Sequence, residues 1–159
     1  MRKVSLLIVG LLIVGFAGTC MYFVAGVSAV NPPIKKYEFS GTIDHLIHEI
    51  QRYSSIDSNV TIKITDLTGD KKDGYGVYFD VKIKLDTSLI IYKLECEKSN
   101  KSTDVSKTLI KLIGAFNDKN YNVGGYGIEA TGVKKMVYNF DTKFLTGLRQ
   151  KQHLAITQL

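Results

Sequence analysis

The chain has 159 residues, of which 45% are hydrophobic and 23% charged, and its formal net charge is +6. This length leaves room for one domain, and the ordinary composition excludes a disordered chain. Four of the 21 basic residues flank an apolar N-terminal stretch, which leaves 17 basic against 15 acidic residues beyond residue 36. Because that balance is nearly even, we expect no nucleic-acid partner.

The N-terminal stretch is the clearest feature of the sequence. No charged residue lies between Val4 and Val30, and this run of 27 residues exceeds the ~20 that a transmembrane helix needs. Arg2 and Lys3 precede it, so the positive-inside rule favours a cytoplasmic N-terminus. The organisation that we expect is a basic end at 1–3, a single transmembrane helix at 4–30 in the lipid bilayer, a linker at 31–39 and one extracytoplasmic domain at 40–159.

Two other fates of this stretch remain open. The small residues before Val30 are suited to signal-peptide cleavage, and a cut after Ala29 would make the domain secreted or periplasmic. Lipidation of Cys20 is the third reading, but the Ala17-Gly18-Thr19 triplet before it is a poor match to the pattern that lipidation needs. The length of the apolar run favours the uncleaved helix over both.

The domain is expected to open with a helix. Lys35 to Phe39 is a linker or a brief strand, and Ser40 or Thr42 can cap the helix that follows. Apolar residues then recur at three- and four-residue spacing as far as Tyr53, which predicts one buried helical face.

Three strands are predicted next. Apolar and polar residues alternate in the segments 60–65, 77–85 and 89–97, which is the pattern of strands with one buried face. A glycine- and aspartate-rich loop separates the first two, and a tight turn joins the last two, so the three form an antiparallel meander. Cys96 at the end of the third strand is expected to be a small buried residue.

The C-terminal part is predicted to be mostly helical. A second helix begins at Ser102 or Thr103 and reaches Phe116, a glycine-rich connection covers 117–132, and a third helix runs from Val133 to near Gln150. The tail from His153 is a short strand or frayed. The expected fold class is therefore α+β, in which an N-terminal transmembrane helix precedes a small antiparallel sheet of three to four strands, covered on one face by about three helices.

The first predicted helix carries candidate metal ligands. His45, His48 and Glu49 project side by side at three- and four-residue spacing, as two ligands of a zinc site would. Their order does not match the zinc-protease pattern, so a solvated helix face is the favoured interpretation. We expect neither a metal nor another cofactor.

The third predicted helix combines an apolar face with basic residues. The basic residues of this helix and the tail are Lys134, Lys135, Lys143, Arg149 and Lys151. An amphipathic basic helix can lie on an anionic membrane surface or dock on a partner, whereas the simpler reading is that its apolar face covers the sheet. We keep the basic residues as candidate contacts for a membrane surface or a partner.

The sequence nominates no catalytic residue, because nothing in it combines a nucleophile with an evident base. Four tyrosines are candidate contacts for a small apolar ligand between the sheet and the helices: Tyr78, Tyr92, Tyr121 and Tyr126. The function that we expect is a membrane-anchored, non-enzymatic interaction or assembly domain outside the cytoplasm, with another membrane or envelope protein as its partner. The alternatives are a secreted or anchored small-ligand-binding module and, third, a hydrolase.

Overall fold

The computed structural model describes residues 32–66, 76–85, 88–99 and 107–159, and these residues belong to one compact unit that starts at Pro32. The predicted transmembrane helix at 4–30, the cleavage site after Ala29 and Cys20 lie outside the described residues. Within the described ranges, no helix is both long and apolar enough to cross a membrane.

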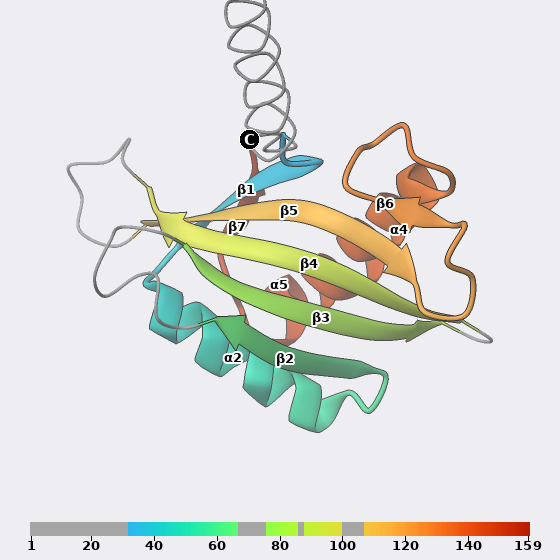
Figure 1. The fold of residues 1–159 in the computed structure, drawn as a ribbon. Coiled ribbons are helices and arrows are strands. Elements are labelled where there is room, and N and C mark those ends of the chain that lie inside the picture. The colour runs from blue at the N-terminus through green and yellow to red at the C-terminus, as the bar shows by residue number, and fades with distance from the viewer. Residues whose placement is uncertain (1–31, 67–75, 86–87, 100–106) are drawn as a thin grey trace, which may run out of the picture. The chain divides into compact units, whose positions relative to one another are not determined.

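The domain is built on a seven-stranded antiparallel sheet (Figure 1). The strands are β1 (Lys35–Ser40), β2 (Val60–Asp66), β3 (Val77–Leu85), β4 (Ser88–Lys98), β5 (Lys107–Asn117), β6 (Gly124–Gly125) and β7 (Ile156–Gln158). The spatial order is β2-β3-β4-β5-β1-β7, and β6 pairs with β5. Strands β2 to β5 form a meander, whereas the connection from β1 to β2 crosses the sheet and contains the first helix.

Two helical regions accompany this sheet among the described residues. Helix α2 (Ile43–Ile56) begins at the predicted cap, where Thr42 Oγ1 accepts a hydrogen bond from the backbone N–H of His45 at 3.2 Å. The second region, which we call the C-terminal helix, is continuous from Val133 to Lys151. It consists of α4 (Val133–Asn139), the π-helical segment η1 (Phe140–Leu145) and α5 (Thr146–Lys151). In Figure 1 the C-terminal helix lies behind the sheet, and α2 runs along edge strand β2.

The core lies between one face of the sheet and these helices. Alternate residues of β3 and β4 are buried there, as the period-two pattern predicts, and Cys96 is among them with no exposed surface. Aromatic rings fill the centre, since Phe140 packs against Tyr92 with ring centroids 4.9 Å apart and against Phe144 at 5.2 Å. The C-terminal helix thus covers the sheet with its apolar face, and the confirmed meander provides the other half of the core.

The predicted fold is wrong in two respects. The sheet has seven strands, not three or four, and the described residues contain two helical regions where about three were expected. Residues 107–117, predicted as the end of the second helix, form β5. Their apolar residues fit helical spacing, but Thr108, Ile110 and Leu112 also alternate with half-buried neighbours. The strand prevails because it hydrogen-bonds to β4 on one side and to β1 on the other.

The short end segments complete this sheet. Lys35 to Phe39 belongs to β1 and is therefore the brief strand, not the linker. The tail also forms a strand, β7, which pairs with β1 from Tyr37 to Phe39. Both pairings are non-local, so nothing in the local sequence distinguishes them from loops.

Candidate functional site

Four of the six large apolar residues that are exposed in the described part of the chain lie in the connection between β5 and the C-terminal helix or in α4. Tyr121 is 93% exposed, Tyr138 66%, Tyr126 44% and Ile128 37%. We call these four residues the tyrosine surface. An ion pair between Lys134 and Glu129, with an N–O distance of 3.0 Å, links the first turn of the C-terminal helix to the connection.

Hydrogen bonds link residues at the two ends of this connection. The N–H of Gly124 donates to the carbonyl of Thr131 at 2.9 Å, and Asn117 accepts from the backbone N–H of Lys119 through its side chain. Gly124 has φ of +129°, and a Cβ there would meet the backbone of β5, so only glycine fits this close approach. The ring of Tyr126 rests edge-on against Phe116 at 5.1 Å.

An ordered loop that exposes tyrosines is suited to protein recognition. A tyrosine offers a large rigid ring and a hydroxyl at a small cost in side-chain entropy, which is why interfaces are enriched in it.

A cavity of about 250 Å³ opens beside the C-terminal end of α2. It lies between the end of α2, the β2–β3 pair and the π-helical segment. Its lining consists of Tyr53, Asp57, Asn59, Val60, Ile83, Lys84, Leu85, Lys143 and Phe144. Val60, Ile83 and Phe144 are almost fully buried core residues, so polar groups provide most of the exposed lining of the cavity.

Asp57 is the only carboxylate among the described lining residues, and its oxygens already have several partners. It accepts hydrogen bonds from the backbone N–H and the side chain of Asn59 and from the hydroxyl of Tyr53 at 3.2 Å, and Lys151 lies 3.7 Å away. The Asn59 backbone bond is the main reason that the pKa of Asp57 lies below its usual value. Burial, followed by the charge and hydrogen bond of Asp57, raises the pKa of Tyr53.

Two lysines in the lining lack such partners. Neither Lys84 nor Lys143 forms an ion pair or a side-chain hydrogen bond with any residue that the structure describes, and both side chains are exposed. Since Lys151 compensates Asp57, the rim of the cavity carries two ammonium groups that have no counter-charge among the residues that the structure describes.

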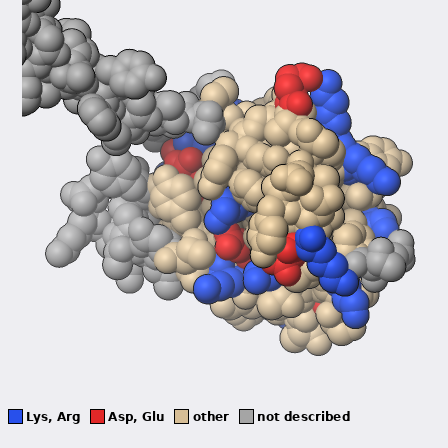
Figure 2. Space-filling view, turned by 45° about the vertical axis from the view of Figure 1, so that its right-hand side comes forward, with Lys and Arg blue, Asp and Glu red and all other residues tan. Residues whose placement is uncertain are grey.

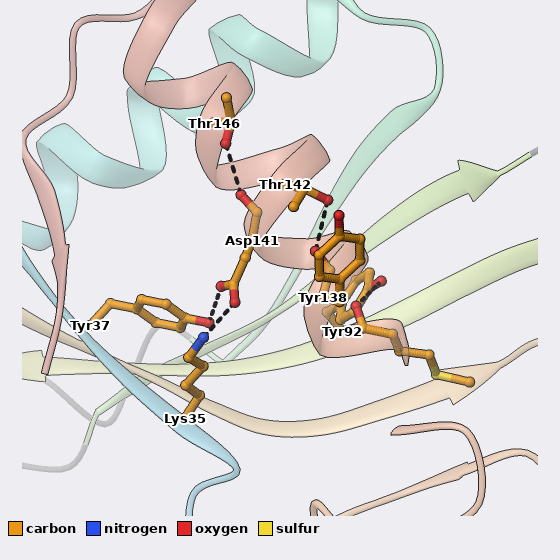
Figure 3. A network of polar contacts seen from close by, with 8 residues as sticks. Lys35, Tyr37, Tyr92, Tyr138, Asp141, Thr142 and Thr146 are labelled. Carbon is orange, nitrogen blue, oxygen red and sulfur yellow. Dashed lines mark hydrogen bonds and ion pairs between the residues drawn. The ribbon is translucent and has the colours of Figure 1, made fainter. Parts of the chain in front are cut away.

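A polar cluster joins the π-helical segment to β1 (Figure 3). Asp141 points from the segment toward β1, where it accepts a hydrogen bond from the hydroxyl of Tyr37 at 2.6 Å and pairs with Lys35 at 2.5 Å. Burial, with the hydrogen bond and charge of Asp141, raises the pKa of Tyr37. Thr146 donates to the Asp141 carbonyl at 3.0 Å. These residues bond to one another, and their bonds attach the C-terminal helix to strand β1 of the sheet.

The four tyrosines proposed as ligand contacts do not converge. Tyr92 is fully buried, and its hydroxyl donates to the carbonyl of Met136 at 2.9 Å. Tyr78 lies on the opposite face of the sheet beside Glu95, and burial together with that carboxylate raises its pKa. Only Tyr121 and Tyr126 share a region, where they belong to the tyrosine surface.

The candidate metal ligands lie apart from any further ligand. His45 packs against Phe39 with ring centroids 5.6 Å apart. His48 Nδ1 lies 3.3 Å from Glu49, whose other oxygen lies 3.6 Å from Arg52. Among the residues that the structure describes, no three His, Cys, Asp or Glu side chains gather closely enough to hold a metal ion.

The five C-terminal basic residues point to different places. Lys134 pairs with Glu129, Lys151 lies beside Asp57, and Lys143 lines the cavity. Arg149 donates through Nε to the carbonyl of Ile156 at 2.9 Å, and Lys135 is exposed. They therefore do not form a single basic face.

Sequence reasoning missed the ion pairs on the sheet face that points away from the helices. They are Lys107–Glu38 at 2.7 Å, Lys111–Glu97 at 2.7 Å, Lys111–Glu95 at 3.3 Å and Lys93–Asp80 at 3.5 Å. Figure 2 shows a side of the molecule on which basic and acidic side chains lie next to each other. The alternating charges on the polar sides of β3 to β5 were the available signal.

No family model matches the chain, and comparisons with curated proteins and with solved structures gave no match. The function is therefore inferred from the geometry of the domain and from the pattern of the sequence.

Proposed function

We propose that the domain is a non-enzymatic interaction or assembly domain, held at a membrane by residues 4–30, which binds another membrane or envelope protein outside the cytoplasm. The observation that carries this proposal is the tyrosine surface, in which Tyr121 and Tyr138 expose most of their rings to solvent. A partner that covers these rings would gain apolar burial from each, and tyrosines are frequent hot spots of interfaces.

The hydrogen-bonded loop supports the proposal energetically. Binding is weakened by the entropy lost when flexible groups become ordered, and a loop that is already held by backbone bonds avoids most of that loss. The charged sheet face is a poorer candidate, because its lysines and carboxylates already pair with one another. A partner would have to break these pairs or leave them in place without gain.

The anchor contributes to the same function. A domain confined to a membrane meets partners in that membrane at a raised effective concentration, so a small surface is sufficient for useful binding. The support for the anchor is the uncharged run of 27 residues from Val4 to Val30, which is longer than the apolar core of a signal peptide.

Site-specific crosslinking tests the interaction surface. A photoreactive phenylalanine derivative is placed at Tyr121 or at Tyr138 of the full chain in its native membrane. Ile56 is the matched control, because it is 62% exposed but lies at the end of α2. We expect both tyrosine positions, and not Ile56, to yield an adduct with the same membrane protein. Adducts with the chain itself alone, or equal adducts from Ile56, would contradict the proposal.

N-terminal sequencing of the mature protein tests the anchor separately. An N-terminus at Met1, or at Arg2 after removal of the methionine, supports the uncleaved transmembrane helix. A mature chain that starts at Val30 would show cleavage after Ala29 and make the domain secreted or periplasmic.

A further inference from the structure

We propose that the cavity between the end of α2, the β2–β3 pair and the π-helical segment binds a small organic anion, with a body about the size of one ring and a single carboxylate or phosphate group. This site lies outside the tyrosine surface and does not depend on the interaction proposed for it.

The charge of the rim selects an anion. Asp57 already accepts three hydrogen bonds and is compensated by Lys151, so it repels an incoming anion only weakly. Lys84 and Lys143 stand in the lining without a counter-charge among the described residues. An ammonium group donates up to three hydrogen bonds and binds carboxylate and phosphate oxygens as a point charge.

The volume and the mixed lining select a small body. Polar groups provide the larger part of the lining, and Val60, Ile83 and Phe144, each at least 95% buried, contribute only a small apolar part. An apolar cavity of ~150 Å³ holds a benzene molecule in another protein, and drug-sized ligands need ~300 Å³ or more. A volume of about 250 Å³ therefore accommodates one substituted ring or a short chain.

The cavity is also preformed. Tyr53 is fixed at its hydroxyl by Asp57 and along its ring by the backbone of Gly147, where a Cβ would collide with it. Its ring packs edge-on against Phe144 with centroids 6.1 Å apart, and Lys151 lies 5.3 Å above its ring centroid. The aromatic part of the lining is therefore held by other contacts and loses no affinity to ordering, whereas the exposed side chains of Lys84 and Lys143 become ordered on binding.

The test uses the full chain in a nonionic detergent and two fluorinated probes, 4-(trifluoromethyl)benzoate and the uncharged 4-(trifluoromethyl)benzyl alcohol, titrated with fluorine NMR. We expect saturable binding of the benzoate, and binding of the alcohol that is at least about tenfold weaker. Raising the salt concentration should weaken the binding of the benzoate but not that of the alcohol, because only the attraction between the benzoate and the lysines is screened.

Two pairs of substitutions locate the binding. Lys84→Gln combined with Lys143→Gln should lower the affinity for the benzoate at least about tenfold. Lys63→Gln with Lys135→Gln, which removes two exposed lysines that do not line the cavity, should leave its affinity unchanged. Circular dichroism melts check that all variants are folded. Equal affinity of the two double variants, or no saturable benzoate binding to the unsubstituted chain, would overturn the proposal, whereas failed crosslinking at Tyr121 would not affect it.

Discussion

Gln152 is buried without a hydrogen-bond partner. The residue is 6% exposed, and neither Nε2 nor Oε1 of its amide is bonded to any described residue. An unsatisfied buried amide costs about 1–3 kcal/mol, and methionine fills a similar volume without polar amide atoms. We expect Gln152→Met to raise the free energy of unfolding by about 1–2 kcal/mol, measured by urea unfolding with circular dichroism.

Gln51 provides the matched control for this substitution. It is exposed on α2, so Gln51→Met should change the free energy of unfolding by no more than about 0.5 kcal/mol. A loss of stability in Gln152→Met would contradict the argument, because it would mean that the buried amide is satisfied in solution.

Tyr37 contributes to stability through a bond to a charged group. Its hydroxyl donates to Asp141 at 2.6 Å in a site where the tyrosine is 1% exposed. We expect Tyr37→Phe to lower the free energy of unfolding by about 1.5–3 kcal/mol, because hydrogen bonds to ionised groups are worth that much. Tyr138→Phe is the control, since Tyr138 is 66% exposed. Equal effects of the two variants would show that the Asp141 bond adds nothing.

At the scale of elements, Gly147 lets α5 approach α2. A Cβ at this position would collide with the hydroxyl and ring of Tyr53, both of which are held by other contacts. Overpacking of this kind costs about 1–3 kcal/mol, so Gly147→Ala should lower the melting temperature although alanine favours helices. Gly127→Ala serves as the control, because nothing lies within 4 Å of a Cβ there. An unchanged melting temperature in Gly147→Ala would show that the helices move apart freely.

The prediction of the elements succeeded where one periodicity dominates and failed where two compete. In the segment 77–85 only period two fits, and the strand was predicted correctly. In β5, apolar Leu109 and Ile113 occur on the polar side of the strand, so helical spacing fits as well. Pairing with β1 stabilises the strand over the helix. Strand β1 lies about 70 residues earlier in the chain, so this pairing cannot be identified from the local pattern.

The candidate sites were predicted less well than the elements, for a similar reason. Tyr121 and Tyr126 were picked out by residue type, but their exposure depends on how the loop folds back on β5. The cavity draws residues from α2, β2, β3 and the π-helical segment, and no spacing in the sequence links Asp57 with Lys143. The π-helical segment itself was predicted only as ordinary helix, because its residues keep an apolar face.

For the whole molecule, burial of ionisable groups sets the pH range of stability. Burial raises the pKa of Tyr37, Tyr92 and Cys96 above their ordinary values. Burial by itself lowers the pKa of Lys111, but bonds and charges from Glu97 and Glu95 outweigh it and raise the pKa overall. On the acid side, Asp57 has a lowered pKa, chiefly through the Asn59 backbone bond.

These directions predict a loss of stability at high pH. A raised folded-state pKa means that the unfolded chain releases its proton first, so the stabilisation is present below the unfolded pKa and is lost as the pH rises. The unfolded values are 9.0 for the thiol of Cys96 and 10.0 for the hydroxyl of Tyr92. The free energy of unfolding of the full chain should therefore begin to fall near pH 9 and fall more steeply above pH 10. Asp57 acts in the opposite sense, since its contribution is lost only as the pH falls below 3.8.

Urea midpoints at intervals from pH 5 to pH 11 measure this dependence. Tyr92→Phe should have a lower midpoint at pH 7, because the bond to the Met136 carbonyl is lost, but a flatter decline above pH 10, because one linked proton is gone. Exposed Tyr121→Phe should change neither the midpoint nor the slope. A midpoint that stays constant from pH 8 to pH 11 in the unsubstituted chain would mean that these groups ionise in the folded state as easily as in the unfolded one, and that the core between the sheet and the C-terminal helix is open to water.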